Sequence, residues 1–197
     1  MNCFYLIITF VDINIALMRI LPDNSAGLII DIQERLLPHI YEGDALILNT
    51  VKLIKGLTLL NLPLLTTQQY SKGLGETVKP IADSIPAFSY IEKISFSCCG
   101  EPAFIGALKN TGRRCVIVCG IEAHVCVLQT CIDLLSQGYL PVIVEDCVSS
   151  RRINDKDIAI ERMKKEGAII TTYESILFEL TQKAGSETFK SISGIVK

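Results

Sequence analysis

The sequence has no excess of basic residues, and this absence excludes one broad class of function. Nineteen Lys and Arg residues face twenty-one Asp and Glu residues, which leaves a formal net charge of −2. Proteins that bind the nucleic-acid backbone need clustered positive charge to neutralise phosphates, so we expect no nucleic-acid partner. Of the 197 residues, 49% are hydrophobic and only 20% are charged, which excludes disorder and favours one domain with a single buried core.

Histidine is also scarce, and the cysteines do not compensate for it. The chain has two histidines, His39 and His124, and eight cysteines, none of which forms a C-x-x-C motif. A structural zinc site needs closely spaced Cys and His ligands, so we expect none. The cysteine spacings match no disulfide framework, and a chain of this length needs none. We therefore expect a reduced, cytoplasmic protein in which most cysteines are small core side chains.

The apolar N-terminal segment lacks the features of a targeting or membrane segment. No Lys or Arg precedes Arg19, so the charged start of a signal peptide and the arginines of a transit peptide are both missing. Asp12 interrupts an apolar run that is already shorter than the roughly 20 residues that span a bilayer. We interpret Met18 as the natural start and residues 1–17 as an extension or tail. We expect residues 1–197 to form a single domain that does not associate with a membrane.

From Ser25 onward, short apolar runs alternate with longer segments of helical periodicity, as in repeated βαβ units. The first run, AGLIIDI, is continuously apolar until its terminal acid, which is typical of a strand buried on both faces. The pattern predicts a three-layer α/β/α doubly wound, Rossmann-like domain with about six mainly parallel strands and an active site outside their carboxyl ends. The expected strands lie within 26–32, 62–66, 89–92, 113–121, 140–147 and 168–174, and the expected helices within 33–60, 125–138, 155–167 and 175–185.

Three reactive side chains lie where such an active site is expected. Asp31 ends the first strand, where loss of water raises the pKa of a carboxyl group toward that of a general base. Lys93 ends another strand, and Cys126 begins a helix, whose dipole favours a thiolate. Each also has an ordinary interpretation: Asp31 as a helix N-cap, Lys93 as a solvated side chain, Cys126 as a buried apolar one. Together they predict a hydrolase in which Asp31 deprotonates Cys126, Cys126 attacks a carbonyl-like carbon, and Lys93 stabilises the charges.

Three motifs contain these residues in the same order: IIDIQERL, EKISFS and GIEAHVCVLQTCIDLLSQGY. They resemble the isochorismatase-like cysteine hydrolases, the superfamily that includes nicotinamidases and N-carbamoylsarcosine amidase, and the similarity covers nearly all of the chain from about Ala26. The resemblance implies a catalytic triad of Asp31, Lys93 and Cys126. It also implies a cis peptide bond between Ile121 and Glu122 that turns backbone N–H groups toward an oxyanion.

The similarity is closest to the isochorismatase-domain-containing proteins, which have a T-E-Q-Y-x-x-G-L-G loop. Here Gln68 replaces the glutamate of that loop. Candidate pocket residues are Gln33 in the D-x-Q segment, Tyr70 in the loop and Phe96 in the lysine segment, although Phe96 is equally typical of core packing. The resemblance implies a homo-oligomer, and the apolar segment SILFEL at 175–180 is suited to an interface.

Metal and redox sites near the expected triad have weaker support. Nicotinamidases bind a metal through an Asp and His cluster, but neither His39 nor His124 forms a D-x-H pair, so we expect no metal and no cofactor. His124 precedes Cys126 by two residues, and residues two apart on a helix do not face each other; we interpret it as structural or as part of the pocket rim. Cys98 and Cys99 follow Lys93 and are either oxidation-sensitive or incidental.

The leading hypothesis is a cofactor-independent hydrolase that cleaves an amide or other C–N bond of a small molecule through a covalent Cys126 intermediate. The alternative is a catalytically weak or inactive family member that acts as a binding or scaffold protein. A third hypothesis is a thiol redox protein that pairs Cys126 with Cys131 or Cys98. The substrate itself does not follow from the sequence, because loops set the shape of the pocket.

Overall fold

The computed structural model describes residues 19–197, in which six strands form one parallel sheet. The strand order is β3-β2-β1-β4-β5-β6, and every pair of neighbours is parallel. This order confirms the doubly wound fold, and its reversal between β1 and β4 marks the switch point where such folds bind ligands. The strands are β1 (Ser25–Ile30), β2 (Leu64–Gln69), β3 (Ile91–Lys93), β4 (Cys115–Ile121), β5 (Leu140–Ser149) and β6 (Ile169–Thr171).

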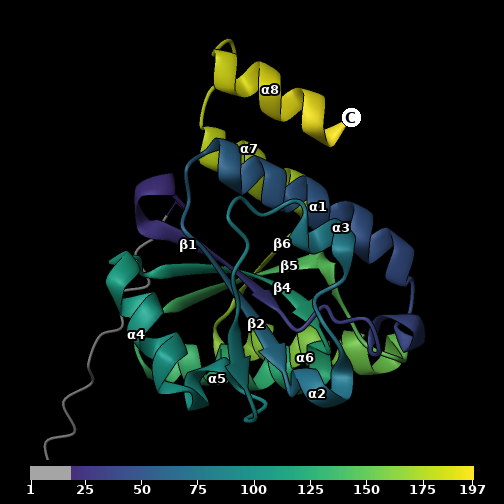
Figure 1. The fold of residues 1–197 in the computed structure, drawn as a ribbon. Helices are drawn as coiled ribbons and strands as arrows, with labels where there is room; N and C mark the ends of the chain where they lie inside the picture. Colours follow the sequence, from purple (N-terminus) through teal and green to yellow (C-terminus); the bar gives the residue numbers. More distant parts are fainter. Residues whose placement is uncertain (1–18) are drawn as a thin grey trace, which may run out of the picture.

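Helices cover both faces of the sheet, as right-handed crossovers require. In Figure 1, α1, α3, α7 and α8 lie on one face, and α4, α5 and α6 lie on the other. The longer helices are α1 (Gly43–Leu59), α4 (Pro102–Thr111), α5 (Leu128–Ser136), α6 (Ile153–Glu166), α7 (Tyr173–Thr181) and α8 (Glu187–Val196). The shorter elements are α2 (Ser71–Leu74), α3 (Lys79–Ala82), 3-10 turns at Pro22–Asn24, Leu37–His39 and Cys98–Gly100, and a π turn at Ala123–Val127.

The central strands are buried on both faces because each face contacts its own layer of helices. All six residues of β1 and all seven of β4 are buried. Alternate side chains enter separate cores: Ile29 belongs to the core under α1 and α7, and Leu28 to the core under α4 and α5. Continuous burial explains why these strands read as unbroken apolar runs in the sequence.

Close approach of β1 and β4 depends on Gly120. Its φ is 134°, and a Cβ atom there would lie 2.2 Å from the carbonyl oxygen of Ile30. Only glycine fits both the backbone conformation and the contact. The two strands therefore converge at their carboxyl ends, immediately before Asp31 and Glu122.

Several details of the sequence prediction are wrong. β2 runs through Gln69, so Gln68 and Gln69 belong to a strand rather than to a Gly-rich loop. Most of the apolar side of SILFEL is not free for an interface, because Ile176, Leu177 and Leu180 are buried in the chain's own core and only Phe178 is partly exposed. Neither α4 nor α8 was expected. Residues 1–17, Met18 and the interpretation of this segment lie outside the described residues.

Candidate active site

A buried ion pair joins two of the predicted residues. Asp31 directly follows β1, and its φ of 52° is a left-handed conformation that Asp tolerates better than most residues. Lys93 is the last residue of β3, and its Nζ lies 2.7 Å from Asp31 Oδ2, with both side chains 0% exposed. The Thr67 hydroxyl of β2 donates to Asp31 Oδ1 at 2.8 Å. Lys93 is therefore not a solvated side chain. The Asp31 carboxylate binds Lys93 and Thr67 rather than capping a helix.

Three neutral oxygens fix the ammonium of Lys93 beside the carboxylate. Lys93 Nζ donates to Gln69 Oε1 at 2.6 Å, to the Phe96 carbonyl at 2.9 Å and to the Ser95 carbonyl at 3.2 Å. Burial alone lowers the pKa of Lys93, but the Asp31 carboxylate and the nearby thiols together raise it above its ordinary value. Lys93 is therefore a fixed cation.

Cys126 lies in the π turn between β4 and α5, next to this ion pair. Its side chain belongs to the core below α5, and the residue is 6% exposed. Burial raises the pKa of the Cys126 thiol well above its ordinary value, the Asp31 carboxylate raises it further, and Lys93 opposes both. These directions favour a protonated Cys126 thiol in the free protein.

The pKa of the Asp31 carboxyl is raised as well, which is the direction expected of a general base. Burial raises the pKa of the Asp31 carboxyl above its ordinary value of 3.8, while Lys93, Thr67 and Cys126 lower it. A carboxylate of raised pKa beside a protonated thiol can accept the thiol proton more readily than an exposed aspartate.

Cys98 is a second thiol at this site. Its Sγ lies 3.7 Å from the Thr67 hydroxyl, and its backbone N–H donates to Thr130 Oγ1 at 3.0 Å. Burial raises the pKa of Cys98 to about 11, and the residue is fully buried. Four further cysteines, Cys115, Cys119, Cys131 and Cys147, are buried core side chains, and all of the described cysteines are free.

The peptide bond between Ile121 and Glu122 is cis. The Glu122 side chain leaves this turn to meet Arg151, whose backbone N–H and Nε donate to Glu122 Oε2 at 3.1 and 3.0 Å. Nearby, His124 Nδ1 lies 2.9 Å from the hydroxyl of Ser150. His124 therefore contacts the end of β5, in agreement with a structural or rim position.

The predicted pocket residues have different surroundings. The buried Gln33 amide donates to the Gln69 and Gly75 carbonyls and accepts from the Gln69 N–H, so it holds the loop that follows β2. Tyr70 and Phe96 are 50% and 54% exposed, which excludes core packing for Phe96. Gln68 donates to Glu76 Oε2 and Thr77 Oγ1 and does not reach Asp31.

The structure adds residues that the motifs did not assign. Thr67 and Gln69 lie within the segment that resembles the family loop. Because they are two residues apart on β2, their side chains lie on the same face of the strand, and this spacing could have indicated both. Arg151 lies two residues after the end of β5, at the same edge of the sheet. Its sequence signal is only its position after an apolar run.

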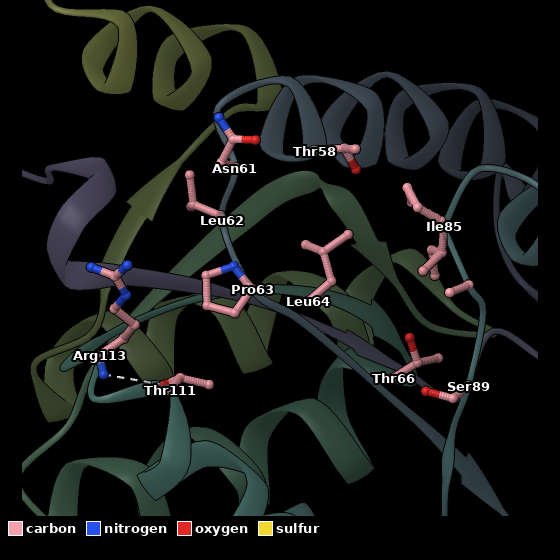
Figure 2. A pocket seen from close by; sticks show the side chains of 12 residues that line it. Thr58, Asn61, Leu62, Pro63, Leu64, Thr66, Ile85, Ser89, Thr111 and Arg113 are labelled. Carbon is pink, nitrogen blue, oxygen red and sulfur yellow. Dashed lines mark hydrogen bonds between the residues drawn. The ribbon is translucent and has the colours of Figure 1, made fainter.

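Two cavities differ in their relation to these residues. A cavity of about 380 Å³ lies at the carboxyl edge of the sheet, lined by Leu36, His39, Ile40, Glu122 and Arg151. A cavity of about 530 Å³ lies where β2 begins, around Pro63 (Figure 2). Its lining contains no carboxylate, thiol or imidazole. Asp31, Lys93 and Cys126 line neither cavity, and the smaller cavity shares with them the carboxyl edge of the sheet.

The sequence from 25 to 175 matches the model of the isochorismatase domain. The chain belongs to the isochorismatase family. It is 37% identical over 183 residues to the secreted isochorismatase effector Isc1 of Phytophthora sojae, covering 91% of this chain and 87% of that protein. It is 34% identical to mouse isochorismatase domain-containing protein 2A, over 92% of this chain and 87% of that protein.

Solved structures show the same fold. The structure of MAR1 ribonuclease from Caenorhabditis elegans has a TM-score of 0.86 and 37% identity, covering 91% of this chain and 92% of that one. YcaC from Pseudomonas aeruginosa, determined with hexane-2,5-diol and covalent acrylamide, has a TM-score of 0.84 and 26% identity, covering 90% and 91%. In residues 19–197, no helix is long and apolar enough to cross a membrane, and no three His, Cys, Asp or Glu side chains cluster as metal ligands would.

Proposed function

We propose that this isochorismatase-family hydrolase uses Cys126 to cleave an amide or other C–N bond of a small molecule. The observation that carries the proposal is the buried Asp31–Lys93 ion pair beside the Cys126 thiol. A fully buried pair with every ammonium proton engaged is a costly arrangement, and a protein retains it where a base must be kept at a set position and charge. The homo-oligomer and the absence of a cofactor stay predictions.

In the proposed reaction, Asp31 takes the proton of Cys126 as Sγ attacks the carbonyl carbon. The C–N bond then breaks, and protonated Asp31 delivers the proton to the leaving nitrogen. Asp31 next deprotonates a water molecule, which attacks the thioester; the C–S bond breaks, and the thiol regains its proton. Lys93 remains protonated throughout and balances the charge of Asp31. Backbone N–H groups of the turn that follows Ile121 and Glu122 are the proposed oxyanion donors, each contributing about 3 to 4 kcal/mol.

The YcaC structure supports the proposal that a protein of this fold can carry a nucleophilic side chain. Acrylamide is an electrophile, so its covalent attachment requires a nucleophilic side chain in that protein. The name of the C. elegans relative makes RNA a second candidate substrate, which the net charge of −2 does not favour. An RNA degradation assay on the same variants distinguishes the two: loss of RNA cleavage in a Cys126 variant would make RNA the substrate class.

Acid quenching during turnover tests the proposal directly. With a panel of small aliphatic and aromatic amides, we expect intact-mass spectrometry to show an acyl adduct, and peptide mapping to place it on Cys126. Asp31→Asn is expected to remove the adduct, because it can no longer accept the thiol proton. An adduct on another residue, or amide turnover without any adduct, would contradict a Cys126 acyl-enzyme. Failure of the whole panel together with tight capture of a partner would favour the binding-protein alternative.

The pH dependence follows from the direction of the two pKa shifts. Asp31 must be ionised to act, and burial raises its pKa, so kcat/KM is expected to fall with decreasing pH at a higher pH than an exposed aspartate gives. Because the pKa of Cys126 is also raised, its alkylation by iodoacetamide in the free protein should still accelerate above pH 9, the ordinary thiol range. A rate that is already constant at neutral pH would indicate a resting thiolate instead.

A further inference from the structure

The cavity of about 380 Å³ lies at the topological switch point. Leu36, His39 and Ile40 come from the segment after β1, Glu122 from the turn after β4, and Arg151 from the segment after β5. The same turn carries Cys126: the Glu122 carbonyl accepts the N–H groups of Val125 and Val127. Cys126 is not itself a lining residue, but it lies in the turn that Glu122 begins, and the volume of the cavity is in the range of small-molecule sites.

Arg151 lines this cavity, and Glu122 holds its guanidinium through Nε. Glu122 Oε2 binds the backbone N–H and the Nε of Arg151, and no other hydrogen bond joins the guanidinium to residues 19–197. Its terminal Nη groups thus remain available as paired donors. The Arg151 side chain is 62% exposed and that of Glu122 only 10%, so the cationic member of the pair is the one that is accessible to solvent and to a ligand. His39 is a second exposed polar side chain on this wall.

We infer that Arg151 determines specificity by binding a carboxylate of the substrate. A guanidinium fork matches a carboxylate in two parallel hydrogen bonds, and Glu122 holds the fork from behind through Nε. Leu36 and Ile40 contribute apolar surface for the carbon chain of the same molecule. The substrate class is then a small amide, or other C–N compound, that carries a carboxylate. This inference rests on the proposed function, because it assigns the substrate of that same site.

Matched substrates separate this role from a structural one. Succinamate and butyramide, and likewise glutaramate and valeramide, differ only by a carboxylate in place of a methyl group. We expect kcat/KM to favour the carboxylates at least tenfold, and Arg151→Gln to lower this ratio at least tenfold, mainly through KM. Arg151→Lys should retain part of the preference, since it keeps the charge and loses the fork. The neighbouring Arg152→Gln is the control: Arg152 is exposed and outside the cavity lining, so the ratio should not change.

The double variant Glu122→Gln, Arg151→Gln removes the ion pair without leaving an unpaired carboxylate. It should show the same lowered ratio as Arg151→Gln. If Arg151→Gln lowers kcat/KM for both members of a pair equally, or if the parent protein has no carboxylate preference, Arg151 does not recognise the substrate. Each of these results would overturn the inference while amide turnover through Cys126 still stands.

Equilibrium binding tests the inference without turnover. In Cys126→Ala protein, calorimetry should show glutaramate binding at least tenfold more tightly than valeramide, and Arg151→Gln in that background should remove the difference. If this binding is present but no amide is hydrolysed by the parent protein, the proposed function fails and the carboxylate site stands. If glutaramate does not bind at millimolar concentration, or binds equally well without Arg151, the inference fails.

Discussion

Cys126→Ala is expected to lower amide turnover at least about 10³-fold, because the proposed covalent intermediate forms on the Cys126 sulfur. The matched control is Cys98→Ser. Cys98 shares the Thr67 hydroxyl with Asp31, but it is fully buried, so its replacement should preserve the acyl adduct on Cys126 and most of the turnover. Both variants remove one thiol from the same site, and only one removes the nucleophile.

Steady-state kinetics and intact mass together decide between the two thiols. Thermal unfolding of both variants provides the stability control, since serine at position 98 introduces a buried hydroxyl beside Thr67. Turnover that survives in Cys126→Ala and disappears in a folded Cys98→Ser would make Cys98 the nucleophile. If peroxide treatment instead joins Cys126 to Cys98 in a reversible disulfide and neither variant affects hydrolysis, the redox hypothesis gains support.

The positions of the reactive residues could be predicted because strand ends can be read from the sequence. Asp31 ends an apolar run that is buried throughout, and the carboxyl ends of neighbouring parallel strands meet at one edge. The burial of Lys93 could not be predicted in this way. It depends on Gln69 and on the carbonyls of Ser95 and Phe96, which surround Nζ only after the loop that follows β3 has packed.

The charge state of Cys126 could not be predicted for a related reason. A helix dipole is a property of local sequence, whereas desolvation depends on side chains from distant elements. Here burial, followed by the Asp31 carboxylate, raises the pKa of the Cys126 thiol. The burial of Ile176, Leu177 and Leu180 could not be predicted for the same reason, since α7 packs against the distant α1 and α8 and no local sequence pattern predicts that contact.

Lys93→Met is expected to destabilise the fold by about 3 to 5 kcal/mol, because it leaves the Asp31 carboxylate buried without its counter-charge. The exposed pair Lys79 and Asp83 is a matched control with a similar separation of 2.8 Å. Its side chains are 84% and 60% exposed, so Lys79→Met should cost less than about 1 kcal/mol. Urea unfolding of both variants measures the difference.

The double variant Asp31→Asn, Lys93→Met separates stability from catalysis. It removes both buried charges, so it should recover much of the stability lost in Lys93→Met, and the cycle with the single variants should give a coupling free energy of several kcal/mol. It should nevertheless be inactive, since no group remains to accept the Cys126 proton. Equal unfolding free energies for Lys93→Met and Lys79→Met would show that Asp31 takes up a proton in the absence of Lys93. In that case the role of Lys93 is to keep Asp31 ionised, and its loss should appear as a rise in the pH at which kcat/KM falls.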